Sequence, residues 1–580
     1  MTIQSTLQDL IQRACESLGV PKDMAPIVLD HPADQKNGDY STNIAMVLFK
    51  SLGASSKSPF DLAEKITARV HDLLKETKHP YIESVQAVHP GFINFRLTKK
   101  FFTESLTEIL DQTVWYGKTK KLWNKKVIIE YTDPNPFKQF HIGHLMSNTI
   151  GEALSRAFDF QDAKLTRATY GGDVGLHVAK CIWGIMRLRD EFPQTNERAQ
   201  VAFLGKAYVY GSNAYEESAD AQKEIKDLNK KIFEKSDPEV QEIYDWGRAI
   251  SIKHFEEIYR KLGSRFDYHF YESEVAEEGK TIVQAFLDRG VFVLSEGAVI
   301  FPGEQHGLHN RVFINSQELP TYEAKELGLT KRKFELHDYD LSIVITASEQ
   351  NDYYKVILKT LEFIYPEIAR RTKHFSHGMM RFASGKMSSR KGNVITGESL
   401  IEDIEKMVYE KMADKNYHEI EKREIAEKVA IAAIKYTVLR QTVGKDIIFD
   451  PEKSLSFEGD SGPYIQYTYV RTKSVLAKAK DEGIEPKIKL STIPDELGTL
   501  ERMLYKFPEV VERSANEFAP HHIVTYITEL AGAFNAYYAN NKIVGKRDSE
   551  SPYKVALTEA VSWVLKNGMY LLGIEAPERM

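Results

Sequence analysis

The sequence contains very little cysteine. Its 580 residues include two cysteines, Cys15 and Cys181, which are far apart and outside any metal-ligand spacing. Two isolated cysteines exclude the disulfide framework of a small secreted protein and also a cysteine zinc site. We therefore expect no structural metal ion in this chain, and a cytoplasmic location.

Long apolar runs and an excess of positive charge are also missing. No apolar segment approaches the roughly 20 residues that cross a membrane, and the first twenty residues lack the basic start and apolar centre of a secretion signal. The formal net charge is −6, which argues against nucleic-acid binding over the whole surface but permits local basic faces. We expect no membrane partner, and a globular chain of this length should hold several domains.

The most informative segment that is present spans residues 127–151. Val127, Ile128 and Ile129 are a β-branched run typical of a buried strand. Two prolines, Pro134 and Pro136, then prevent continuation of the strand and indicate a turn. After the turn, helical spacing on one side links Ile142, Leu145, Ile150, Ala153 and Leu154. The segment therefore predicts a strand, a turn and a helix in that order.

This arrangement places His141, Gly143 and His144 in the first turn of the helix. A helix start carries unpaired N–H groups and a positive dipole end, so it suits a phosphate group. Two histidines three residues apart share one face and can both donate hydrogen bonds to a phosphate. Gly143 leaves room for a flat base to approach the backbone. The alternative is that these are ordinary polar residues at a helix start.

A second motif lies about 240 residues downstream, in the basic, hydroxyl-rich segment from Gly385 to Asn393. Alone, it reads best as a solvated basic turn, although its lysines suit a triphosphate. The ordered pair, HIGH at residues 141–144 and KMSSR at 386–390, resembles the two signatures of class I aminoacyl-tRNA synthetases. Strands that alternate with helices in the surrounding sequence favour a parallel sheet.

We predict a multidomain α/β protein with a Rossmann-like parallel-sheet catalytic domain. Residues 1–117 should form an α+β module, and residues 118–400 the catalytic domain with a helical insertion at about 189–262. A helical connector is expected at 401–460. The remaining residues, 461–580, should form an all-α domain that binds the anticodon.

Within the class, the chain resembles the arginyl-tRNA synthetase family over nearly its whole length. The matching segments are GDYSTN at 38–43, PGFINF at 90–95, PNPFKQFHIGH at 134–144, FEGDSGPYIQY at 457–467 and PERM at 577–580. The resemblance implies activation of L-arginine with ATP, accompanied by Mg²⁺ on the triphosphate, and transfer of arginine to the terminal adenosine of tRNA(Arg). It also implies a role in cytoplasmic translation and a monomer as the family default.

The resemblance assigns His141 and His144 to the α-phosphate and Lys386 to the departing pyrophosphate. One position departs from the class pattern, because Ser389 stands where the second lysine of the loop is usual. In arginyl enzymes without that lysine, a lysine just before HIGH is thought to replace it. Lys138 stands there, and the rival substitutes are Arg390 and Lys391.

Substrate residues are also carried over from the family. A carboxylate pairs bidentately with a guanidinium. The resemblance assigns Glu130 and Asn135 to the polar end of the amino acid, Tyr322, Glu326 and Gln350 to the rest of the arginine pocket, and Asp173 to a turn near the substrate. Glu326 replaces the family's usual aspartate, and a structural role for Asp173 is equally open. The expected ATP-binding residues are Gly143, His377, Gly378, Met379, Met380 and Ser388, although both methionines could belong to the core.

The expected tRNA contacts combine aromatic and basic side chains, which stack unpaired bases and bind phosphates. They are Tyr464, Tyr467, Arg471, Tyr537, Tyr538 and Met580, with Asn94 as a candidate contact to the tRNA elbow. A tyrosine stripe on a helix can instead be core. Three other functions remain open: a nucleotidyltransferase without tRNA, a non-catalytic RNA-binding relative, and a synthetase for another amino acid.

Overall fold

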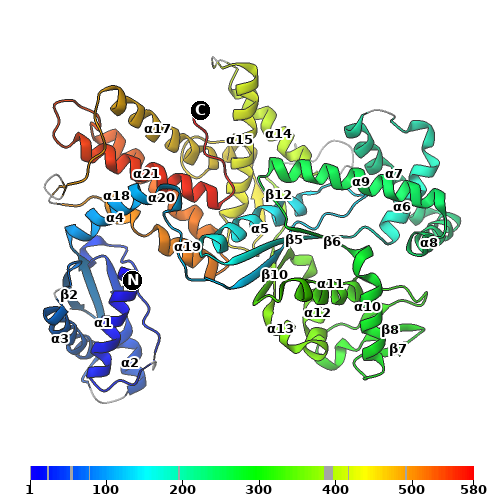
Figure 1. Ribbon diagram of the computed structural model, residues 1–580, viewed down its shortest axis with the longest axis horizontal. Coiled ribbons are helices and arrows are strands. Elements are labelled where there is room, and N and C mark those ends of the chain that lie inside the picture. The colour runs from blue at the N-terminus through cyan, green and yellow to red at the C-terminus, as the bar shows by residue number, and fades with distance from the viewer. Residues whose placement is uncertain are drawn as a thin grey trace. The chain divides into compact units, whose positions relative to one another are not determined.

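The computed structural model describes most of the chain, and its helices and strands are shown in Figure 1. None of the helices in the described part is long and apolar enough to span a membrane. The described residues are 2–22, 25–52, 56–77, 79–193, 196–383, 396–413, 415, 417–489, 493–494 and 496–580, without the side chains of 51 and 52.

The chain forms two compact units. The first combines Met1–Tyr116 with Thr472–Phe507 and Ala533–Val564. The second combines Gly117–Arg471 with Pro508–Gly532 and Leu565–Met580. Residues 461–580 therefore contribute to both units.

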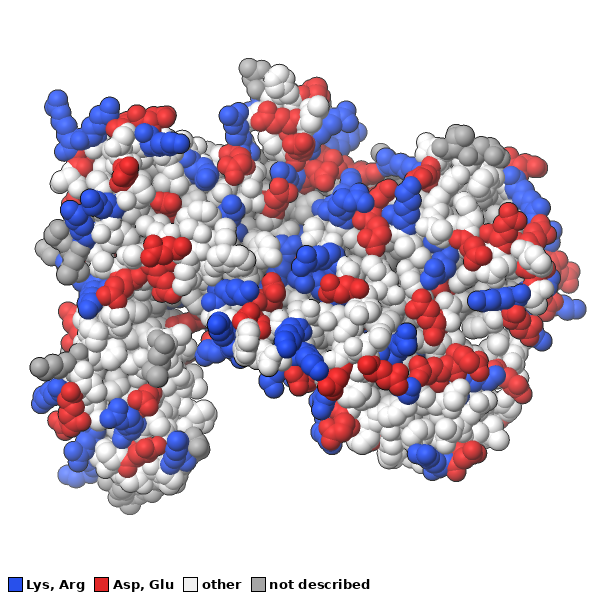
Figure 2. Space-filling view, viewed as in Figure 1, with Lys and Arg blue, Asp and Glu red and all other residues white. Residues whose placement is uncertain are grey.

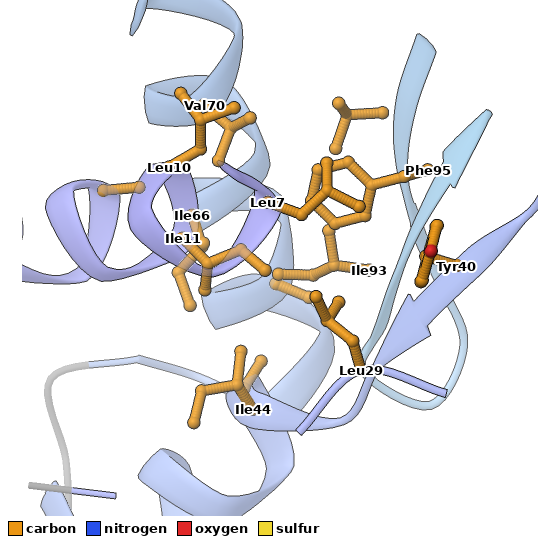
Figure 3. Close-up of a cluster of buried hydrophobic side chains, with 14 of the residues drawn as sticks. Leu7, Leu10, Ile11, Leu29, Tyr40, Ile44, Ile66, Val70, Ile93 and Phe95 are labelled. Atoms are coloured by element: carbon orange, nitrogen blue, oxygen red, sulfur yellow. The ribbon is translucent and has the colours of Figure 1, made fainter. Parts of the chain in front are cut away.

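The amino-terminal part of the first unit packs helices on a small sheet. Strands β1 (Tyr40–Thr42), β3 (Phe92–Leu97) and β2 (Ile82–Val88) form an antiparallel sheet in that order. The helices are α1 (Ile3–Ser17), α2 (Ile44–Leu52), α3 (Pro59–Thr77) and α4 (Lys99–Gln112). Apolar residues at helical spacing on α1, namely Leu7, Leu10 and Ile11, meet Ile93 and Phe95 of β3 in the core (Figure 3). This confirms the predicted α+β module.

The second unit is built on a parallel sheet in the order β11-β10-β4-β5-β6. Its strands are β4 (Lys126–Glu130), β5 (Lys164–Gly171), β6 (Tyr268–Tyr271), β10 (Leu341–Ala347) and β11 (Thr372–His377). The strand order runs outward in both directions from β4, so the crevice between β4 and β10 is a topological switch point, where ligands bind in such sheets. The predicted Rossmann-like parallel sheet is confirmed.

Helices cover both faces of this sheet (Figure 1). Helix α5 (Ile142–Phe160) follows the turn after β4, and α6 (Leu176–Arg187) follows β5. Three helices, α7 (Glu197–Glu217), α8 (Ala219–Glu234) and α9 (Pro238–Lys261), lie in the range where a helical insertion is predicted. The sheet face opposite α5 carries α10 (Glu272–Leu287), α11 (Tyr322–His337), α12 (Asn351–Ile364) and α13 (Pro366–Arg371).

Two small sheets were not expected from the sequence. Strands β7 (Val293–Ser295), β8 (Ala298–Phe301) and β9 (Arg311–Ile314) form an antiparallel sheet between α10 and α11. Strand β12 (Met380–Phe382) pairs in parallel with β13 (Ile447–Phe449).

The rest of the chain is helical, as predicted. Helices α14 (Gly397–Lys411), α15 (Glu419–Leu439) and α16 (Pro451–Ser454) follow the sheet. The last helices are α17 (Gly462–Asp481), α18 (Thr499–Leu504), α19 (Phe507–Asn516), α20 (His521–Asn540) and α21 (Ser551–Leu571).

Candidate active site

The candidate site begins where the chain leaves β4 at the switch point. Successive residues alternate in direction here: the hydroxyl of Tyr131 donates to Glu152 of α5 at 2.6 Å, and Glu130 faces α11. The turn that follows contains three non-glycine residues with positive φ, namely Thr132, Asp133 and Phe137. Such backbone persists only where its surroundings hold it.

Polar residues of α5 hold this turn. The Thr132 N–H donates to Ser147 Oγ at 3.0 Å, and that hydroxyl donates to the Ile345 carbonyl of β10 at 2.9 Å. The Asn148 amide donates to Thr132 Oγ1 at 3.0 Å. These bonds join the turn, α5 and β10, so they fix the start of α5 relative to the crevice.

His141 and His144 form a reciprocal cap at the start of α5. His141 Nδ1 accepts from the His144 N–H at 3.4 Å, and His144 Nδ1 accepts from the His141 N–H at 3.2 Å. The two rings stack with centroids 3.5 Å apart. Because both Nδ1 atoms accept, a neutral ring must carry its proton on Nε2. Each histidine therefore has an Nε2–H donor that the helix does not use.

The surroundings of these rings favour the neutral form. Burial, the Lys138 charge and His377 lower the pKa of His141. Burial, followed by His141 and Lys138, holds the pKa of His144 well below its usual range. A methyl group on Gly143 would lie 3.0 Å from the His141 ring, so glycine lets that ring lie over the first helical turn. The start of α5 thus carries two Nε2–H groups that the cap leaves unused, and their role as phosphate donors stays a prediction.

Lys138 lies close enough to lower the pKa of three histidines: His141, His144 and His177. Its ammonium is 5.5 Å from the centre of the Tyr208 ring on α7. Burial lowers the pKa of Lys138 itself. The lysine therefore places a cation beside the histidine pair. Lys386, Ser388, Ser389, Arg390 and Lys391 lie outside the described residues.

A buried acid cluster lies at the end of β4, opposite α11. Lys333 donates to Glu130 Oε2 at 2.8 Å, and both residues are 1% exposed. Glu326 lies two helical turns before Lys333 and is also buried. Burial, and then the charge of Glu130, raise the pKa of Glu326 to about 8. The same two causes raise the pKa of Asp133 well above its usual range.

Two other residues that are predicted to bind arginine, Asn135 and Asp173, already accept hydrogen bonds from the protein. Asn135 Oδ1 accepts from the Gly172 N–H at 2.8 Å. The Asp173 carboxylate, fully buried, accepts from Arg248 Nε at 2.8 Å, from Ser273 Oγ at 2.7 Å and N–H at 2.9 Å, and from Tyr244 at 3.2 Å. Four protein donors on Asp173 favour its structural role over ligand binding.

Tyr322 and Gln350 are both solvent-exposed. Tyr322 begins α11 and is 54% exposed, and Gln350 is the last residue of a single 3₁₀ turn (Ser348–Gln350) directly after β10. Helix starts and strand ends of this kind are where parallel sheets present ligand-binding side chains.

The predicted adenine residues lie at and just after the end of β11. His377 is buried, with Nδ1 2.8 Å from the Gly378 carbonyl, and its Nε2 has no partner among the described residues. A methyl group on Gly378 would lie 2.3 Å from the Lys445 backbone, so that glycine is required by packing. Met379 is 39% exposed, while Met380 packs against the core.

Two of the predicted tRNA residues, Tyr467 and Met580, line one apolar cavity in the second unit. The cavity has a volume of about 150 Å³. The Tyr467 ring lies edge-on to Phe457 with centroids 6.2 Å apart, and the Arg471 guanidinium is 4.9 Å from the Tyr467 ring. The cavity lining also includes Lys411, Lys415, Tyr417 and Phe457, which the sequence analysis missed.

The remaining tRNA predictions fall on other surfaces. Tyr464 lies in the first turn of α17, and its N–H donates to Ser461 Oγ at 3.1 Å. In the first unit Tyr538 is 43% exposed and Tyr537 is half-buried. Asn94 is mostly buried in β3, and Ser41 donates to its Oδ1 at 2.6 Å. Its burial disfavours Asn94 as a ready RNA contact.

Sequence reasoning also missed the buried cations of the site. Lys333 pairs with Glu130, and Lys325 donates to Glu272 at 2.6 Å with both residues buried. Lys333 could have been found from its spacing to Glu326, because residues seven apart on a helix share one face. Glu326 and Lys333 have that spacing.

Comparison with protein families gives three matches along the chain. Residues 105–451 match the catalytic domain of class I tRNA synthetases (R), and residues 465–580 match the DALR anticodon binding domain. Residues 5–97 match the arginyl tRNA synthetase N terminal domain.

Individual proteins agree with these families. The arginine–tRNA ligase of Halothermothrix orenii is 30% identical over 580 residues, covering 99% of both chains, and that of Fusobacterium nucleatum is 29% identical with the same coverage. Among solved structures, Thermus thermophilus arginyl-tRNA synthetase has a TM-score of 0.81 at 22% identity and covers both chains fully. The Plasmodium falciparum arginyl-tRNA synthetase has a TM-score of 0.78 at 19% identity, covering 100% of this chain and 99% of the other.

Proposed function

Because this chain belongs to the arginyl-tRNA synthetase family, we propose that it joins L-arginine to tRNA(Arg) at the expense of ATP. The arginine carboxylate attacks the α-phosphate, pyrophosphate leaves, and a ribose hydroxyl of the terminal adenosine then accepts the arginyl group. The observation that carries the proposal is the pair of Nε2–H donors at the start of α5, beside a buried acid cluster.

The acid cluster is the proposed site of the arginine side chain. Glu326 has a buried carboxylate to which no side chain donates within the described part of the chain, and Glu130 is held by one oxygen. A planar guanidinium matches such carboxylates. The resemblance assigns Glu130 to the polar end of arginine, but we propose it for the guanidinium end, because it bonds Lys333 of α11 and because burial and its charge raise the pKa of Glu326. Asn135, whose Oδ1 is already bonded to the Gly172 N–H, would use its amide NH₂ on the polar end of arginine, and Tyr322 and Gln350 would complete the pocket.

The phosphates of ATP, bound with Mg²⁺ as part of the substrate, would lie at the start of α5. There His141 and His144 donate Nε2–H groups to the α-phosphate as its charge rises, and Gly143 leaves space above the helix. Lys138 and Lys386 neutralise the departing pyrophosphate, with Ser388 nearby. The adenine would pack at His377, Gly378 and exposed Met379, while Met380 supports it from the core.

The apolar cavity is the proposed site for an unpaired anticodon base. Its aromatic walls, Tyr467 and Phe457, offer stacking surfaces, and Lys411 and Lys415 among its lining residues offer phosphate contacts. Tyr464, Arg471 and Met580 belong to the same unit, and Tyr537 and Tyr538 to the other. We further propose a monomer that acts in the cytoplasm.

The decisive experiment is aminoacylation of bulk tRNA with each labelled amino acid in turn. We expect charging with arginine alone, and its loss on periodate treatment of the tRNA, which destroys the terminal ribose diol. Charging with another amino acid, or arginine-dependent ATP use without any charged tRNA, would overturn the proposal.

A further inference from the structure

Lys333 is a buried cation within a cluster of acids. It lies on α11, seven residues after Glu326, so that both side chains share one helix face. From there it donates to Glu130 of β4 at 2.8 Å. Its positive charge also acts on Asp133 and on Glu326. One ammonium therefore serves three carboxyl groups from two neighbouring elements and the turn after β4.

The cluster contains three carboxyl groups, and the single positive charge of Lys333 cannot balance all of them when they are ionised. Glu326 is 4% exposed, and in the described part of the chain no side chain donates to its carboxylate. A buried carboxylate without a donor is costly when ionised. The titratable groups that interact with it come from several elements: Glu130 on β4, Tyr170 on β5, Glu272 on α10, Lys333 on α11, Tyr353 and Tyr354 on α12, and Asp133 in the turn after β4.

We propose that Lys333 is a positioning residue for the arginine side chain: it anchors Glu130 by one oxygen and supplies the positive charge that lets Glu130 and Glu326 ionise together around one guanidinium. The proposal rests on the arginine site proposed above. The guanidinium then completes the charge balance that Lys333 begins, and a neutral side chain of the same shape does not.

Proton exchange follows from this arrangement. Burial and Glu130 raise the pKa of Glu326 to about 8, so we expect Glu326 to hold a proton in the free protein at pH 7. A bound guanidinium favours the ionised form, and binding therefore releases a proton. Lys333 remains charged throughout, because Glu130 and Glu326 raise its pKa despite burial. Arginine affinity should rise about tenfold per pH unit below pH 8 and level off above it.

The test is calorimetric titration of the full chain with L-arginine from pH 6 to 9, in two buffers of different ionisation enthalpy to count protons. Wild-type protein should release up to one proton at pH 7, and citrulline, the uncharged isostere, should not bind. K333M should bind arginine at least tenfold more weakly at pH 7, and its levelling point should move at least one pH unit upward. K333R keeps the charge and should stay within about threefold of wild type.

The matched control is Lys331→Met, on the same helix. Lys331 pairs with Glu278 and Glu335 on a more exposed face, so K331M should leave affinity and pH profile unchanged. If K333M does not fold, Lys333→Gln replaces it, because glutamine keeps a hydrogen-bond donor toward Glu130 without the charge. K333Q should also bind arginine at least tenfold more weakly at pH 7, and wild-type affinity would overturn the proposal.

If K333M loses arginine affinity by the same factor at every pH, Lys333 has only a structural role, and the proposal is wrong. Unchanged affinity in K333M would also overturn the inference. A different result belongs to the function itself: if wild-type protein binds another amino acid and not arginine at any pH, the ligase assignment fails.

Discussion

At the scale of single residues, His141 and His144 each use their two ring nitrogen atoms for different roles. The Nδ1 atoms cap α5, and the Nε2–H groups point away from that cap. A substitution can separate the two roles, because glutamine at the third helical position can still accept the back-bond of a capping box.

We expect His144→Gln to lower arginine-dependent ATP–pyrophosphate exchange, measured with tRNA present, by about a hundredfold or more, because a donor to the α-phosphate is lost. Its thermal stability should stay near wild type. His144→Ala should lose the same activity and also about 1 kcal/mol of stability with the cap. Near-normal exchange by folded H144Q would contradict the phosphate role.

Lys138 should act as the substitute for the missing lysine of the KMSSR loop, because its charge already reaches His141 and His144. Lys138→Ala should impair exchange, measured with tRNA present, much more than Ser389→Ala does. Adding Ser389→Lys to K138A should restore part of the rate. If K138A exchanges at the wild-type rate, the prediction for Lys138 is wrong, and Arg390 or Lys391 must replace the missing lysine.

Buried histidines should make the fold sensitive to acid. His177 is buried, and its ring bonds the Gly172 carbonyl at 2.8 Å. Burial, followed by the charge of Lys138, lowers its pKa to about 3. Since the unfolded chain takes up this proton near pH 6.5, stability should fall by about 1.4 kcal/mol per pH unit below that value. Urea unfolding from pH 7 to 5 should show a shallower slope for His177→Gln, and an unchanged slope would refute the assignment.

At the scale of elements, the sequence predicts those helices, strands and turns that depend on neighbouring residues. The apolar run at Val127–Ile129, the two prolines and the helical spacing after His141 together predict β4, the turn and α5. The pairing of β12 with β13 was not predicted, because strands of three residues carry little periodicity and their partners are far apart in sequence. Likewise no local pattern links Glu130 to Lys333, which meet only when α11 packs on the sheet.

Helix α17 carries a prediction at this scale. Tyr467→Ala and Arg471→Ala should each weaken tRNA binding about tenfold, because they remove a stacking surface and the cation beside it. The Michaelis constants for ATP and arginine should stay nearly unchanged, since the cavity lining holds none of the predicted residues for either ligand. Ile448→Ala, which removes an exposed apolar side chain outside this cavity, is the control. A loss of arginine affinity with intact tRNA binding would contradict the assignment.

At the scale of the whole molecule, tRNA should be required for the first chemical step. The KMSSR loop has one lysine fewer than the class pattern, so tRNA contacts made preferentially in the productive state would have to raise its population. We expect negligible arginine-dependent exchange in nuclease-treated enzyme and robust exchange after addition of tRNA(Arg). Full exchange without RNA would refute this order of events.

The strand order of the parallel sheet also matters while the chain is being made. Strand β4 can pair with β5 soon after synthesis, but its other edge waits for β10, about 210 residues later. At about 5–20 residues per second, that edge stays open on the ribosome for roughly 10–40 s. An open apolar edge can pair with strands of other chains, so this nascent chain is exposed to wrong pairing for that time. Arginine codons in this interval are read with the very tRNA that the finished enzyme charges, and arginine shortage therefore lengthens the exposure.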